Sequence, residues 1–207
     1  MPPLVDPNDH DVFILRQRIK LVINQYEFFL PSAGGELGEP LCFVEQKRFK
    51  FKEDIRFYAD ASKTQELLRI KARQRFDPRA TYDVTDSVGT KIGAIQKVFG
   101  ASLLRSTYAI LDAGGQQIAI TTEKSLPIAI FRRAVGFIPY VDNVADWLPI
   151  PYHFVFKRGE EIIGENTRQT FKIRDNYTID MSADTQRVLD RRLVLAIAVG
   201  MDALQAR

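Results

Sequence analysis

The sequence is poor in the residues that most often carry out chemistry. Its 207 residues include one cysteine and two histidines. A single cysteine excludes an internal disulfide, which fits a reducing compartment. Cysteine and histidine together are too few for a zinc site. Because Cys42, His10 and His153 have no evident base or orienting partner, we predict a non-enzymatic protein with no metal and no cofactor.

Long hydrophobic runs and strong charge are also missing. The N-terminal residues show no cationic start followed by an apolar run, so we expect no secretory signal. No apolar run approaches the roughly 20 residues that a membrane-spanning helix needs. The net charge of +3 is too mild to indicate a nucleic-acid partner. These absences predict a cytoplasmic protein that is not integral to a membrane.

Short alternating segments dominate the chain from Phe13 onward. They are rich in β-branched and aromatic residues, and turn residues separate them, so they predict about twelve strands. Turns such as Asp112-Ala113-Gly114-Gly115 place glycine where a hairpin needs a positive φ, which favours an antiparallel meander. We expect a flexible lead over residues 1–12 and a single domain over residues 13–207. The predicted strands are Phe13–Val22, Glu27–Leu30, Leu41–Phe51, Ile55–Ala59, Leu67–Phe76, Ala80–Thr85, Lys91–Val98, Ser106–Leu111, Gln117–Thr122, Tyr152–Lys157, Glu161–Thr167 and Phe171–Met181.

Two helices are expected among these strands. One has the body Ile128–Val135, with Ser125 as a cap and Gly136 at its end. The other is the last segment, which is apolar around its whole circumference and must therefore be buried. Its uncharged run, Leu193–Met201, is too short to span a bilayer. The fold class that follows is mainly β, a closed antiparallel barrel of about twelve strands around a buried C-terminal helix.

Cations recur at every second position in three of the predicted strands, so each set lies along one face of its strand. One interpretation is a solvated barrel exterior, with Glu45, Glu53 and Glu66 as partners. The other is a surface that binds anions, such as lipid headgroups. The first row is Arg16, Arg18 and Lys20; the candidate binding residues are Arg48, Lys50 and Lys52 in the second row and Arg69, Lys71, Arg73 and Arg75 in the third. Asp175, Asp180 and Asp184 are an alternative set that could supply oxygen ligands for calcium.

The C-terminal end resembles the LURP-one-related family, within the wider Tubby-like and phospholipid-scramblase group. Phe171–Asp180 is similar to the last strand of that family, and the segment from Asp190 to Gln205 is similar to its closing helix. Phe49–Asp54 and the hairpin at Asp112–Gly115 fit less specifically. The resemblance covers nearly everything after the lead and implies a twelve-stranded barrel around a C-terminal helix. It also implies peripheral membrane association, because Tubby-like domains bind phosphoinositide headgroups through basic residues.

The favoured function is a non-enzymatic barrel that binds anionic phospholipid headgroups, or another anionic partner, at the inner membrane face. The first alternative is a scramblase-like lipid mover, for which the chain lacks the cysteine cluster and proline-rich arm of the scramblases. The second alternative is a structural barrel that binds other proteins and no lipid.

Overall fold

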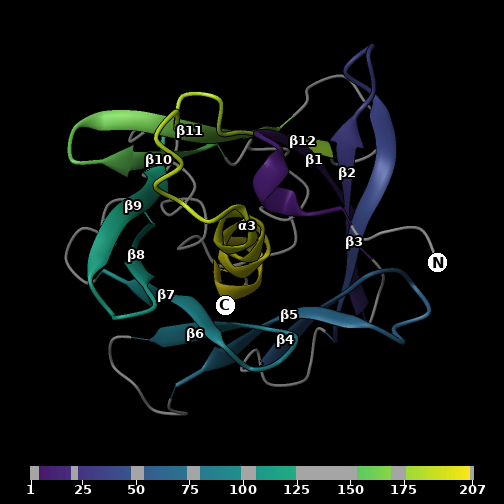
Figure 1. Cartoon of the computed structure of the whole chain (residues 1–207), viewed down its shortest axis with the longest axis horizontal. Helices are drawn as coiled ribbons and strands as arrows, with labels where there is room; N and C mark the ends of the chain where they lie inside the picture. The colour runs from purple at the N-terminus through teal and green to yellow at the C-terminus, as the bar shows by residue number, and fades with distance from the viewer. Residues whose placement is uncertain are drawn as a thin grey trace, which may run out of the picture.

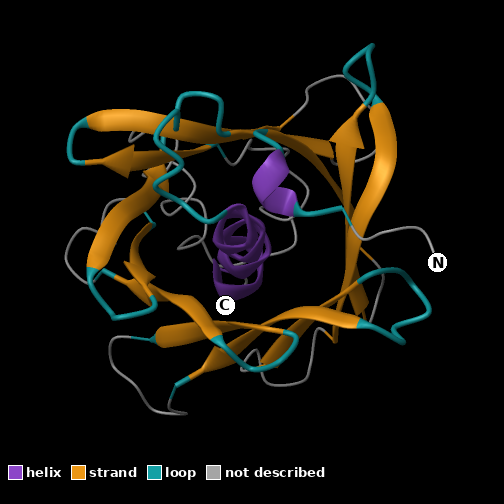
Figure 2. Ribbon diagram, viewed as in Figure 1, coloured by secondary structure: helices purple, strands orange, loops and turns teal. Residues whose placement is uncertain are grey.

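The computed structural model describes residues 5–19, 23–47, 54–73, 80–98, 106–124, 153–168 and 176–205. Twelve antiparallel strands form a closed barrel, and one long helix lies along its axis (Figures 1 and 2). The predicted fold class is therefore confirmed. The helix predicted over Ile128–Val135 lies outside the described residues.

Each strand pairs with its neighbours in the sequence, and β1 pairs with β12 to close the ring. Each of the twelve predicted strands overlaps one strand of the barrel, and two of them begin at Ile23 and Leu37, four residues before the predicted start. The predicted strand residues 20–22, 48–51, 74–76, 152 and 171–175 lie outside the described residues. The strands are β1 Val12–Ile19, β2 Ile23–Pro31, β3 Leu37–Lys47, β4 Asp54–Tyr58, β5 Glu66–Ala72, β6 Thr81–Asp86, β7 Lys91–Lys97, β8 Thr107–Asp112, β9 Gln117–Glu123, β10 Phe154–Arg158, β11 Glu161–Arg168 and β12 Asn176–Asp180; a short helix, η1 Pro7–Asp9, precedes them and α3 Arg191–Gln205 follows them.

Alternation along the strands separates the core from the surface. In β4, Ile55 and Phe57 are buried, whereas Asp54 and Arg56 are exposed. Successive side chains of a strand point to opposite faces, so one set enters the barrel and the other stays outside. The tight hairpins have the predicted glycines in the left-handed region, with φ of 88° at Gly89 and at Gly115. These turns hold neighbouring strands in antiparallel register.

The axis of the barrel is occupied by α3 (Figure 1). Its residues Val194, Ala196, Ile197 and Val199 are completely buried, as the sequence predicts for a helix that is apolar all round. Burying one aliphatic side chain of the size of valine or isoleucine contributes about 1.5–3 kcal/mol. The helix is therefore a large part of the main core that the strands enclose.

Small residues let the wall approach this helix. A Cβ atom added at Gly93 in β7 would lie 2.8 Å from Cδ1 of Leu193 and closer still to the carbonyl oxygen of Leu111. A Cβ at Gly200 in α3 would lie 3.5 Å from Cδ1 of Ile95, an ordinary contact distance. Gly93 is therefore the tighter of these two positions.

Replacing this wall glycine tests the packing of α3 against β7. We expect Gly93→Ala to lower the free energy of unfolding by about 1–3 kcal/mol, because the added methyl overpacks the core. Gly34→Ala is the matched control, since nothing lies within 4 Å of its Cβ position, and we expect a change within about 0.5 kcal/mol. Urea denaturation measures both. Equal stability of the two variants would contradict this packing.

Candidate anion-binding surface

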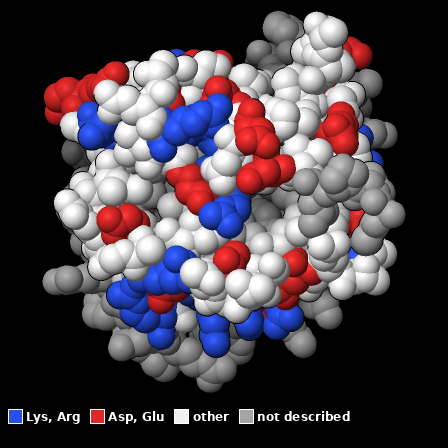
Figure 3. Space-filling model, in the orientation of Figure 1, with Lys and Arg blue, Asp and Glu red and all other residues white. Residues whose placement is uncertain are grey.

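The outer wall formed by β4 to β7 carries most of the described candidate cations. Figure 3 shows Lys and Arg side chains gathered at the lower edge of the view, over these strands, with acidic side chains among them. The cations of this wall are Arg56, Arg69, Lys71, Arg73 and Lys91, and the acidic residues among them are Asp54, Glu66 and Asp83. We call these eight residues the charged wall.

The cations of β5 stand at every second position, as the sequence predicts, but two of them are held by carboxylates. Arg69 donates from Nε and Nη2 to Asp54, at 2.7 and 2.6 Å. Arg73, just beyond the end of β5, donates in the same two-pronged way to Asp83, at 3.1 and 2.8 Å. Planar guanidinium groups favour such paired bonds to carboxylates. The two acids thus neutralise part of the row.

Lys71 differs from its two neighbours in the row. It is exposed and lies between Asp54 and Asp83 in the strand register. Among the residues that the structure describes, its ammonium group has no ion pair, whereas Lys91 approaches Asp83 at 3.2 Å. Lys71 is therefore the cation of the β5 row that no carboxylate of the described residues binds directly, with Asp54 and Asp83 opposite it in the register.

The pKa shifts on this wall follow from these pairs. The hydrogen bond from Arg69 lowers the pKa of Asp54, against the opposing effect of partial burial. The hydrogen bond from Arg73 likewise lowers the pKa of Asp83, and the bond to Asp54 raises the pKa of Arg69. All of these groups are thus charged at neutral pH, and the wall holds five positive against three negative side chains.

The three cationic rows do not form one continuous patch in the described residues. Arg16 and Arg18 lie on β1, and both contact Glu27 of β2, at 2.7 and 3.1 Å. Strands β2, β3 and β4 separate this row from β5. Lys20, Arg75 and the whole second row of Arg48, Lys50 and Lys52 lie outside the described residues. Glu27 thus offsets one of the two positive charges of Arg16 and Arg18.

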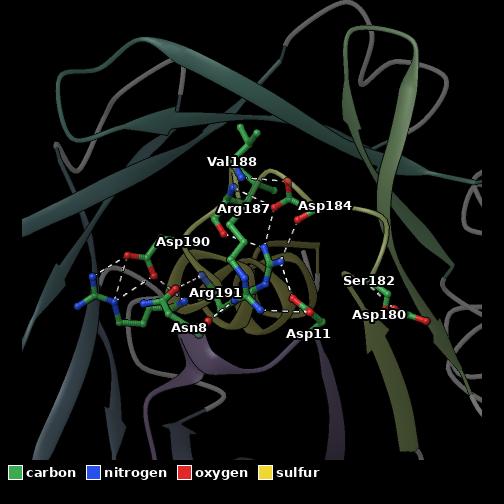
Figure 4. Close-up of polar contacts among 11 residues, drawn as sticks. Asn8, Asp11, Asp180, Ser182, Asp184, Arg187, Val188, Asp190 and Arg191 are labelled. Carbon is green, nitrogen blue, oxygen red and sulfur yellow. Dashed lines mark hydrogen bonds and ion pairs between the residues drawn. The ribbon is translucent and has the colours of Figure 1, made fainter.

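A second polar cluster lies at the end of the barrel where α3 begins (Figure 4). Arg191 is completely buried there. Its Nη1 donates to Asp184 at 2.6 Å, and its Nη2 donates to Asp11 at 2.7 Å. Asp190 caps the helix by accepting from the backbone N–H of Arg192 at 2.9 Å. We call Asn8, Asp11, Asp184, Arg187 and Arg191 the end cluster.

The end cluster accounts for one of the candidate calcium ligands. Asp184 accepts from Arg191 and from the backbone N–H groups of Val188 and Leu189, at 2.9 and 3.1 Å. Asp180 accepts from the backbone of Ser182, and Asp175 lies outside the described residues. The described part of the chain contains no group of three His, Cys, Asp or Glu side chains that could hold a metal ion. In the structure, the carboxylate of Asp184 binds the buried guanidinium of Arg191.

The pairing of Arg191 with Asp184 and Asp11 is not among the predictions from the sequence. The position of Arg191, at the start of a helix that must be buried, indicates that this residue needs an acidic partner, because a buried charge requires an opposite charge. Its partners are 7 and 180 residues away, and no spacing rule selects them.

Cys42 is buried in the core and burial raises the pKa of its thiol, so the thiol stays protonated at neutral pH.

The fold is that of a closed antiparallel β-barrel whose axis is filled by a helix. The model of the LURP-one-related family matches residues 41–202. The match covers more than half of the chain, so this protein belongs to the LURP-one-related family. A search of the curated proteins finds no match. Across the described residues, no helix has the length and apolar character needed to cross a membrane.

The buried ion pair yields a stability prediction. Asp184→Asn removes one of the two carboxylates that pair with the fully buried guanidinium of Arg191, the other being that of Asp11, and we expect the free energy of unfolding to fall by about 3 kcal/mol. Glu160→Gln is the matched control, because its side chain is fully exposed, and we expect a change within about 0.5 kcal/mol. Urea denaturation at neutral pH measures both variants. A loss in Asp184→Asn no larger than in the control would contradict the role of this pair.

The same variant has a defined pH dependence. Burial acts to raise the pKa of Asp184, but the hydrogen bonds from Arg191, Val188 and Leu189 outweigh it and the pKa lies below its ordinary value. The carboxylate therefore stabilises the fold above the unfolded pKa of about 3.9, and this stabilisation is lost as the pH falls through the lower, folded-state pKa. The unmodified protein should lose more stability than Asp184→Asn between about pH 5 and strongly acidic pH. Parallel stability curves would contradict this assignment.

Proposed function

We propose that this protein is a non-enzymatic barrel that binds anionic phospholipid headgroups at a membrane surface through the charged wall. The observation that carries the proposal is Lys71, exposed and without an ion pair among the described residues, at the centre of a row whose flanking arginines are held in place. Arg69 and Arg73 are already paired with carboxylates, whereas Lys71 can approach a headgroup without first breaking an ion pair within the described residues.

The magnitude of the attraction also suits a peripheral protein. Each well-placed cation contributes about 1 kcal/mol near an anionic surface, and the attraction decays within a Debye length. Two positive charges in excess on the charged wall give weak, reversible attachment. The proposal includes Arg48, Lys50, Lys52 and Arg75 on their sequence pattern alone. With them, the attachment is stronger and remains dependent on salt.

The proposed binding site is on the outer face of the barrel because α3 fills the interior. Carrier barrels bind their ligand in an open interior, whereas here the side chains of α3 are packed against the wall. We infer that the interior has a structural role and that the outer wall carries the contact with a partner.

Sedimentation with liposomes tests the proposal. We expect binding to vesicles that contain anionic lipid, little binding to neutral vesicles, and a loss of binding as salt is raised. Lys71→Gln should weaken binding about fivefold, which corresponds to about 1 kcal/mol. Arg158→Gln is the matched control, because it removes one charge from β10, where Arg158 donates to Gln186 at 2.7 Å.

Two results would contradict the proposal. One is equal partitioning to anionic and neutral vesicles at low salt. The other is an equal effect of Lys71→Gln and Arg158→Gln, which would place the contact away from the charged wall. A chain that binds neither kind of vesicle would instead favour a structural barrel that binds other proteins.

A further inference from the structure

A short N-terminal segment covers the end of the barrel where α3 begins. Residues 5–10, here called the strap, include η1, which lies beside the start of α3 in Figure 1. Asn8 is its main point of attachment. The side-chain Oδ1 of Asn8 accepts from the backbone N–H of Arg191 at 2.9 Å, and its carbonyl oxygen accepts from the guanidinium of Arg187 (Figure 4).

Asn8 therefore accepts hydrogen bonds from two donors, the backbone N–H of Arg191 and the guanidinium of Arg187. The first backbone N–H groups of a helix have no partner within the helix, and they carry the positive end of its dipole. Arg187 adds a guanidinium that is nearly half exposed, at 46%. The backbone of Arg187 is itself in the left-handed region, with a φ of 50°. This conformation is unfavourable for a side chain other than glycine, and contacts such as those to Asn8 and Asp11 help to hold it.

The strap and the rest of the end cluster are attached in different ways. None of the side chains of η1 is buried, and Val5, which is partly buried, packs against the core. Asp11, by contrast, is fixed at the start of β1, because its carbonyl oxygen accepts from the backbone N–H of Met181 at 2.7 Å. Segments with few buried apolar contacts open locally at a small cost in free energy, whereas core elements open only with the whole fold.

We propose that the strap is a movable cover, which opens at Asn8 while the barrel, α3 and the pair of Arg191 with Asp184 stay folded. Opening turns the first N–H of α3 and one side of the Arg187 guanidinium outward at this end of the barrel. Closing returns both donors to Asn8. The end face thus has a covered and an uncovered form, and the two forms differ in the contacts of Asn8 with Arg187, Asp190 and Arg191.

Hydrogen exchange of single amides, followed by NMR, tests this proposal on the full chain. In the unmodified protein we expect the amide of Arg191 to exchange on the order of tenfold or more faster than that of Val199, through an opening that low urea does not promote. In Asn8→Ala we expect faster exchange at Arg191 and unchanged exchange at Val199. Asp9→Ala is the matched control, because Asp9 lies in the same turn and its side chain makes no hydrogen bond within the described part of the chain.

Three results would overturn the proposal. The first is exchange of Arg191 and Val199 with the same urea dependence, which would mean that the strap opens only when the barrel unfolds. The second is faster exchange at Val199 in Asn8→Ala, which would make Asn8 a support of the whole fold. The third is equal exchange at Arg191 in Asn8→Ala and Asp9→Ala, which would mean that Asn8 does not protect this amide.

Discussion

The structure depends on the burial of α3 inside a closed wall of strands. A helix that is apolar on every side cannot rest on one face of an open sheet, because its other sides would stay in water. Closure of the strands removes both this exposure and the free sheet edges. Gly93 meets this constraint in part, because a Cβ there would clash with Leu193 of α3 as well as with the carbonyl oxygen of Leu111 in β8. The same constraint explains Arg191, because a helix start inside the barrel brings a charge that has to be neutralised there.

The inside, the outside and the end of the barrel differ in character, because α3 fills the axis and leaves the polar contacts to the outer wall and the end. Inside, side chains from all the strands and from α3 form the main core. Outside, bidentate pairs hold Arg69 and Arg73 on the charged wall, and Lys71 is exposed between them. At the end, Asn8 attaches a strap to the first turn of α3 through polar contacts. The proposed binding of lipid headgroups would use the outer wall.

Periodicity made the architecture predictable from the sequence. Alternation of period two located the strands, glycines in the hairpins indicated antiparallel order, and the apolar run at Leu193–Met201 required an enclosure. The charged wall was predictable only in part. Alternation placed Arg69, Lys71 and Arg73 on one face, but the pairing of Arg69 with Asp54 depends on the register between β4 and β5. The end cluster was not predictable, because Asn8 and Asp11 meet Arg191 only after the chain has gone once around the barrel.

The most direct test of the central claim is the reactivity of a cysteine placed in α3. Val199→Cys puts a thiol where the native side chain is completely buried, and Val88→Cys puts one at a hairpin tip that is 84% exposed. The account predicts that a thiol reagent modifies position 88 at once. It predicts that position 199 is modified only as fast as the barrel unfolds, in step with the buried Cys42. Rapid modification of position 199 in the folded protein would contradict the enclosure of α3.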